Sequence, residues 1–127
     1  MRELTSHKVN GCNKAITITP VGEPGPGGAH TRYDVRGPSK QMLGVGMVPS
    51  FAEHIKFQRG DPAVSVNGVT NEALLAIVAD RLEGFQRGPF ACEENAAALT
   101  AVQGAMAILA VRAAKRESWL VDGLKTV

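Results

Sequence analysis

The fold is decided by residues 70–118, which read TNEALLAIVADRLEGFQRGPFACEENAAALTAVQGAMAILAVRAAKRES. Thr70 and Asn71 are suited to cap a helix N-terminus, and Glu72 places an acid in the first turn. The pair Gly88-Pro89 is typical of the end of a helix, so the pattern predicts a helix of about sixteen residues. The apolar positions that recur at helical spacing are Leu74, Leu75, Ile77, Val78, Leu82 and Phe85.

A second helix is predicted from about Cys92–Asn95 to about Ser118. Between Asn95 and Val111 it is nearly uncharged, whereas a helix on the surface of a monomer usually has a charged back face. We therefore expect it to contact protein on more than one face. The preceding helix would cover one face, in an antiparallel hairpin, and the same helix of a second subunit would cover another. Its apolar stripe, which has heptad spacing, consists of Leu99, Val102, Met106, Leu109 and Ala113.

The first half of the chain has the pattern of strands and loops. Residues 15–19 and 31–35 alternate and contain β-branched side chains, which predicts two strands. The Gly/Pro-rich segment 20–30 joins them into a hairpin with a long, irregular tip. Two more short strands are predicted at 55–58 and 63–66.

Residues 37–50 are again rich in glycine and proline. We expect them to form a mobile loop or an arm that packs on a neighbour. The resulting fold class is α+β, with N-terminal antiparallel strands and Gly/Pro-rich loops before a C-terminal two-helix hairpin, in an oligomer. A single domain is expected over residues 1–127. Its β-rich, ligand-binding part covers about 13–66 and its helical hairpin about 70–118.

The composition excludes several classes of protein. Hydrophobic residues make up 44% and charged residues 20% of the chain, which is ordinary for a globular protein and argues against disorder. With 14 basic and 12 acidic side chains the net charge is +2, too small for a protein that coats nucleic acid through charge. Cys12 and Cys92 are expected to be buried free thiols of a cytosolic protein. No signal peptide is visible, and the longest apolar region, 105–114, is shorter than a bilayer span, so no membrane association is expected.

The sequence contains no arrangement typical of an enzyme site. His7, His30 and His54 are dispersed, so neither a metal nor another cofactor is predicted. The glycine-rich residues 22–28 lack the Lys-Ser/Thr of a nucleoside-triphosphate loop and precede a strand instead of a helix. They are expected to form the hairpin tip, where exposed backbone amides can still bind an anion.

Residues 55–72 combine the groups needed to bind a nucleotide without cleaving it. Phe57 can stack on a base, and the amides of Gln58 and Asn67 can read its edge. The guanidinium of Arg59 and the start of the following helix can bind phosphate. Each residue taken singly also fits a structural role, as core or turn, but together they predict a nucleotide site.

A longer pattern carries a resemblance to a known family. It consists of FQRGDP at 57–62, VNGVTNEALLAIVADRLEGFQRGPFACEENAAALT at 66–100, and the upstream GPGGAHTRY at 25–33. Over roughly residues 10–118 the chain resembles the phage Thoeris anti-defence sponges of the first-described type. Their C-terminal helical hairpin is shared with phage sponges against CBASS immunity. After Glu117 the sequence departs from the family, with VDGL where a GVEGT type of sequence is usual, so nothing is carried over there.

The resemblance implies a non-catalytic protein that acts in the host cytoplasm. It would bind and sequester cyclic ADP-ribose isomers and, in some members, hold cyclic oligonucleotides at a separate site. The implied assembly is a homo-oligomer in which dimers group into a hexamer. The family's strand arginine corresponds to Arg32, its stacking aromatic to Phe57, and the amide at the strand-to-helix turn to Asn67. The arginines on its helices correspond to Arg81 or Arg87 and to Arg112 or Arg116.

Two other functions remain compatible with the sequence. One is an enzyme that degrades the same nucleotides, and the other is a phage structural or regulatory protein whose helical hairpin binds another protein. A sponge returns its ligand intact after denaturation and an enzyme does not. A protein-interaction module would gain no thermal protection from nucleotides.

Overall fold

The computed structural model describes residues 2–121, with side chains as far as Glu117. The family departure at 121–124 therefore lies outside the described residues, except for the backbone of Val121. The chain divides into two compact units, Met1–Val69 and Thr70–Val127. Antiparallel strands in the first unit and a helix pair in the second confirm the predicted α+β class.

The N-terminal unit contains a three-stranded antiparallel sheet in the order β1-β2-β5. Strand β1 (Thr17–Pro20) pairs with β2 (Arg32–Arg36), which confirms the predicted hairpin and its irregular tip. On its other edge β2 pairs with β5 (Ala52–Lys56), which begins three residues before the predicted strand. A short helix, α1 (Gly11–Lys14), precedes the sheet and had not been predicted.

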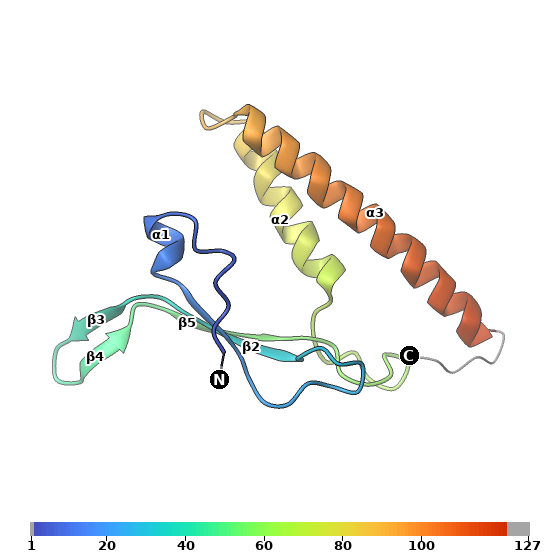
Figure 1. Ribbon diagram of the computed structural model, residues 1–127, viewed down its shortest axis with the longest axis horizontal. Helices are drawn as coiled ribbons and strands as arrows, with labels where there is room; N and C mark the ends of the chain where they lie inside the picture. Colours follow the sequence, from blue (N-terminus) through green and yellow to red (C-terminus); the bar gives the residue numbers. More distant parts are fainter. Residues whose placement is uncertain (1, 122–127) are drawn as a thin grey trace. The chain divides into compact units, whose positions relative to one another are not determined.

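Strands β3 (Ser39–Met42) and β4 (Gly46–Pro49) form a second antiparallel pair. Of the two alternatives predicted for residues 37–50, the loop without regular structure is therefore wrong, whereas an arm that packs on a neighbour stays a prediction. The register of this strand pair continues that of β2 and β5. The amide of Gly37 donates a hydrogen bond to the carbonyl of Phe51, and the amide of Ser50 donates one to the carbonyl of Pro38. Residues 32–56 are therefore one long hairpin, visible in Figure 1 as β2 and β5 running into β3 and β4. Gly44 and Gly46 adopt positive φ at its tip, and Pro38 and Pro49 lie within it without ending the pairing. Glycine and proline, which usually mark the end of a strand, therefore hid these strands in the sequence.

The predicted strand at 63–66 is also wrong. The Asp61 carboxylate accepts a hydrogen bond of 2.9 Å from the amide of Ala63. The amides of Val64 and Ser65 donate to the Asp61 carbonyl, which closes a turn. The local Asp-Pro turn chemistry therefore prevails over the β-branched residues that follow it.

The helical unit agrees closely with the prediction. Helix α2 (Asn71–Gln86) has 16 residues, and the Thr70 side chain caps it by accepting from the amide of Ala73 at 3.1 Å. Helix α3 (Glu93–Val121) runs antiparallel to it (Figure 1), with Glu93 and Glu94 in its first turn. Its predicted apolar stripe is the side that is half-buried: Leu99, Val102, Met106, Leu109 and Ala113.

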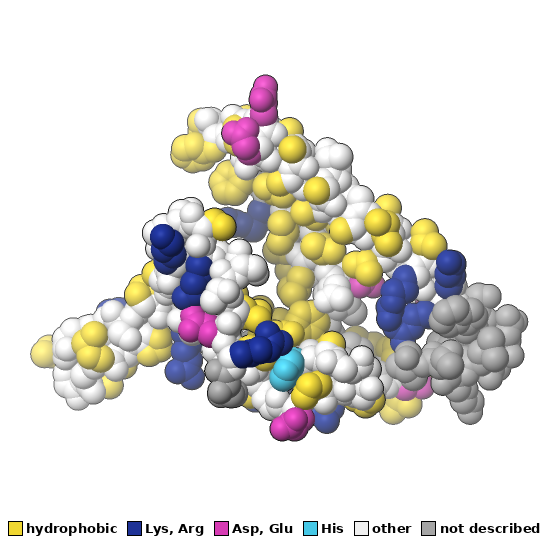
Figure 2. All heavy atoms as spheres, viewed as in Figure 1, with side chains coloured by type: hydrophobic (Ala, Val, Ile, Leu, Met, Phe, Trp, Pro, Cys, Tyr) yellow, Lys and Arg dark blue, Asp and Glu magenta, His cyan; other side chains and the backbone are white. Residues whose placement is uncertain are grey.

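Other apolar side chains of the hairpin remain exposed, and Figure 2 shows hydrophobic atoms along its visible face. Ile108 is 71% exposed, and Val111 and Ile77 are 57% exposed. Among the side chains described, only Pro20 and Ala79 are buried. Both cysteines are exposed, so the prediction of buried thiols is wrong. Cys92 instead caps α3, where its sulfur accepts from the amide of Asn95 at 3.4 Å.

By length and composition alone, α3 between Glu93 and Glu117 is apolar enough to cross a membrane, with a mean hydropathy of 1.5 over its most apolar window. The prediction from the sequence considered only the apolar region 105–114, which Arg112 interrupts, and missed this property of the whole helix. An alanine-rich helix that packs in a protein assembly has the same composition, so this measure does not separate the two environments.

Candidate functional site

Phe57 lies where β5 ends and the connection to the helical unit begins. Its amide donates to the Thr31 carbonyl at 2.7 Å, which anchors it beside β2. Its half-buried ring meets Tyr33 edge-on, with ring centroids 5.7 Å apart, and Tyr33 in turn meets His30 at 6.3 Å. The predicted stacking residue therefore belongs to an aromatic cluster in which edge-to-face contacts fix the orientation of the rings.

Beyond Phe57, the two predicted amides close the loop 58–67. The Gln58 side chain donates to the Ser65 carbonyl at 2.8 Å and accepts from the amide of Asn67 at 3.0 Å. The Asn67 side chain bonds both backbone groups of Arg59, accepting at 2.9 Å and donating at 2.8 Å. A primary amide has two donor hydrogens and two acceptor lone pairs, so each keeps capacity for a ligand while it holds the loop.

Replacing Asn67 with alanine is expected to lower the free energy of unfolding by about 1–2 kcal/mol, because two hydrogen bonds to Arg59 are lost at an exposed site. Amide hydrogen exchange should accelerate between residues 59 and 66 and remain unchanged in α2. Asn71→Ala, at an exposed position of α2, serves as the control. Equal exchange in both variants would show that Asn67 does not hold the loop.

The loop is closed at its base by a parallel bridge between Phe57 and Val69. The amide of Gln58 donates to Val69, and the amide of Val69 donates to Lys56, each at 2.8 Å. Gly68 lies directly against this bridge. A Cβ atom at Gly68 would lie 2.5 Å from the Phe57 carbonyl oxygen and 2.7 Å from that of Lys56. The glycine of the predicted Asn-Gly turn is therefore required for the close approach of two backbone segments.

The sheet has one polar face. Residues paired directly across antiparallel strands project to the same side, so the register places Arg32 with Lys56 and Asp34 with His54. A shallow pocket on this face is lined by Thr17, Thr19, Asp34 and Arg36. Tyr33 and Phe57 belong to the opposite, apolar face. Two of the predicted ligand residues, Arg32 and Phe57, are thus on opposite faces of the sheet in one subunit.

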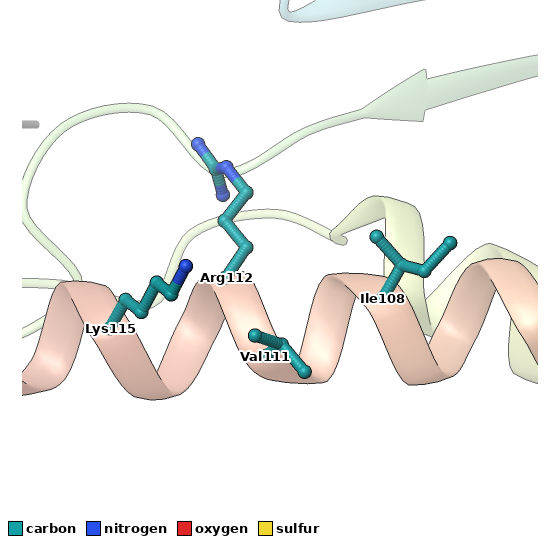
Figure 3. Close-up of a pocket in the computed structure, with 4 residues that line it drawn as sticks. All are labelled: Ile108, Val111, Arg112 and Lys115. Atoms are coloured by element: carbon teal, nitrogen blue, oxygen red, sulfur yellow. The ribbon is translucent and has the colours of Figure 1, made fainter.

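The arginines predicted on the helices are far apart along the hairpin. Arg87 caps the end of α2, and the guanidinium of Arg81 lies 5.6 Å from the centroid of the Phe85 ring. Arg112 follows the start of α3 by 19 residues, or about 28 Å along the helix axis. Figure 3 shows Arg112 and Lys115 extending from α3 beside Ile108 and Val111, which together line a shallow, largely apolar surface.

Arg116, one turn further along, is half-buried and continues the spacing of the apolar stripe of α3. One subunit therefore does not bring Arg81 and Arg87 together with Arg112 and Arg116. Within residues 2–117, no three His, Cys, Asp or Glu side chains are placed to hold a metal ion.

Sequence reasoning missed Asp34, His54 and Tyr33. Asp34 and His54 are 20 residues apart and become neighbours only through the register of β2 and β5. The alternation of Arg32, Asp34 and Arg36 was the available signal, because it marks one polar face of a strand.

Comparison with known proteins agrees with this architecture. Residues 52–114, which include β5, the closed loop, α2 and most of α3, match the family model of the Acb2/Tad1 hairpin domain. Over 70 residues the chain is 43% identical to "Thoeris anti-defense 1" of Bacillus phage SBSphiJ7. The matched region covers 54% of this chain and 49% of that relative, so it spans about half of the relative's length. The chain belongs to the family of phage Thoeris anti-defence proteins that carry the Acb2/Tad1 hairpin domain.

Proposed function

We propose that this protein is a phage anti-defence protein that acts in the cytoplasm of the infected host. It binds cyclic nucleotide immune signals and removes them from solution without cleaving them. The observation that carries the proposal is the match of residues 52–114 to the hairpin domain of this family, together with the identity to a phage Thoeris anti-defence protein. The proposed ligands are cyclic ADP-ribose isomers and, at a separate site, cyclic oligonucleotides.

The chemistry of the first unit supports a nucleotide ligand. The half-buried aromatic ring of Phe57 stands next to two amides whose orientation is fixed by hydrogen bonds to the loop. On the paired strands β2 and β5, the polar face of the sheet carries three cationic side chains, Arg32, Arg36 and Lys56, and one carboxylate, that of Asp34. Its net charge therefore favours an anionic ligand. Stacking and charge-assisted hydrogen bonds bind a base and its phosphates and need no nucleophile.

Self-association completes the proposed site. Because Arg32 and Phe57 lie on opposite faces of the sheet, one ligand can contact both only if a second subunit contributes one of them. A chain of this length normally buries about two-thirds of its unfolded surface, yet only two described side chains are buried in the subunit. We therefore propose that the exposed apolar side of α3 packs in dimers that group into a hexamer, and not against lipid or a long nucleic acid.

The test is to mix the purified protein with a panel of cyclic ADP-ribose isomers and cyclic di- and trinucleotides. Thermal shift identifies the ligand, and mass spectrometry of the supernatant before and after denaturation follows its fate. A ligand that is depleted and then returns intact supports sequestration. A changed mass would identify an enzyme. No protection by any nucleotide would favour a structural or regulatory module whose helices bind another protein.

In the same assay, Arg32→Ala is expected to weaken binding about ten- to a hundredfold, because a charged contact to phosphate is worth roughly 1.5–3 kcal/mol. The Arg32 side chain is 44% exposed, so the melting temperature should change little. Phe57→Ala is a less selective variant, because it also removes the ring contact with Tyr33. Wild-type affinity in Arg32→Ala would remove this residue from the site.

A further inference from the structure

On the polar face of the sheet, Asp34 connects two side chains that the sequence does not associate. The register of β2 and β5 places His54 directly opposite Asp34, and the His54 Nδ1 atom lies 2.6 Å from the Asp34 Oδ1 atom. The Arg32 Nε atom is 3.8 Å from the same carboxylate oxygen, and Arg32 Nη2 is 3.5 Å from His54 Nδ1. The guanidinium, the carboxylate and the imidazole thus form one cluster across two strands.

The chemistry of the 2.6 Å contact fixes the proton. An ionised carboxylate is an acceptor only, so His54 Nδ1 must carry the hydrogen and donate it to Asp34. Nδ1 then cannot accept from Arg32, and the 3.5 Å approach is a contact without a hydrogen bond between these two nitrogens. The Asp34 Oδ1 atom therefore connects the other two side chains, because it accepts the hydrogen bond from His54 and also attracts the Arg32 guanidinium.

This arrangement matters for a long, exposed arginine. An arginine side chain loses considerable rotamer freedom when it is fixed, and a weak ion pair at 3.8 Å does not hold it alone. The Asp34 carboxylate also has a drawback, because an unpaired negative charge beside Arg32 would repel a phosphate. The hydrogen bond from His54 fixes the carboxylate and disperses its charge, so that Asp34 can hold Arg32 at a lower electrostatic penalty for the ligand.

We propose that Asp34 and His54 are positioning residues, which hold the Arg32 guanidinium in the orientation that receives a phosphate of the ligand. This inference rests on the proposed function, because Arg32 is taken as a ligand-binding residue there. The other polar groups on this face are Thr17, Thr19 and Arg36, which line the pocket with Asp34, and Lys56 opposite Arg32. None of them links His54 to Arg32.

The experiment is a double-mutant cycle, measured by calorimetric titration with the cyclic ADP-ribose isomer that the wild type binds best. His54→Ala is expected to weaken binding about three- to fivefold, in keeping with the small contribution of an exposed ion pair such as Arg32–Asp34. In an Arg32→Ala background the same change should have less than about a 1.5-fold effect, because the residue to be positioned is gone. His54→Asn, whose amide can donate to Asp34 in place of Nδ1, should restore most of the affinity. Lys56→Gln is the control, and its effect should persist in the Arg32→Ala background.

Wild-type affinity in His54→Ala, or an equal loss with and without Arg32, would overturn the inference. If the wild type binds no isomer, the proposed function fails, and a measurement without ligand decides the positioning role. The Arg32 side-chain Nε–Hε group gives an NMR signal whose heteronuclear NOE reports its mobility. We expect this NOE to fall in His54→Ala and in Asp34→Asn and to recover in His54→Asn, whereas an unchanged NOE in both would refute positioning.

Discussion

Gly68→Ala is expected to lower the free energy of unfolding of the N-terminal unit by about 3 kcal/mol, the largest loss of stability among the variants considered. A Cβ atom at this position meets the backbone of Phe57 and the carbonyl oxygen of Lys56, and neither is a flexible side-chain end that can move aside. The two 2.8 Å hydrogen bonds that close the loop would have to break to make room. Urea unfolding followed by tyrosine fluorescence measures the change.

Gly27→Ala is the matched control. Gly27 also lies in the first unit, but a Cβ atom there meets nothing within 4 Å, and its backbone is not left-handed. Its stability should stay within about 0.5 kcal/mol of the wild type. If Gly68→Ala unfolds at the same urea concentration as Gly27→Ala, the backbone of Phe57 leaves room for a Cβ atom at Gly68, and the close approach at the Phe57–Val69 bridge is refuted.

Ile108→Glu is expected to dissociate the assembly completely into folded monomers. Ile108 is 71% exposed in the subunit, so a carboxylate there is harmless to the helix pair itself. In the proposed interface it would be buried without a partner, at an effective penalty of roughly several kcal/mol for each copy. Light scattering at micromolar concentration should give the subunit mass of 13.4 kDa, with the helical circular dichroism retained.

Gln103→Glu adds the same charge at an exposed polar position of α3 and should leave the oligomer intact. A wild-type protein that is itself a compact monomer at this concentration would contradict the proposed self-association. Flotation with lipid vesicles addresses the apolar composition of α3 in the same samples. We expect the wild type to remain at the bottom of the gradient.

The helices could be predicted from the sequence because their signals are local. The cap at Thr70, the apolar spacing of α2 and the Gly88-Pro89 stop all lie within one continuous segment. Strands β3 and β4 could not be predicted in this way, because their stability depends on partners across the hairpin, and their glycines and prolines obscure the alternation. At 63–66 a strand was predicted where none forms, because a short run with two valines is not stable as a strand without a partner strand.

In the candidate site, too, residues that are close in the sequence could be predicted together, whereas residues brought together by strand pairing could not. Phe57, Gln58 and Asn67 were predicted together because they lie in one short segment, and they are indeed joined through one closed loop. Their role as ligand contacts remains a prediction. Asp34 and His54 could not be linked without the register of β2 and β5, and the opposite faces of Arg32 and Phe57 follow only from the strand pleat.

The shared register of the long hairpin restricts how its length can vary. Its pairs continue without offset from Arg32–Lys56 at the base to Met42–Gly46 near the tip. Removing Lys40 together with its partner Val48 shortens both arms and leaves every remaining pair matched. Removing one of them alone forces a bulge or a slip, and a slip reaching the base would separate Asp34 from His54. Insertions and deletions near the tip of the long hairpin should therefore be tolerated when they occur as matched pairs, one residue in each strand. The hairpin can then become longer or shorter while the pairing at its base is unchanged.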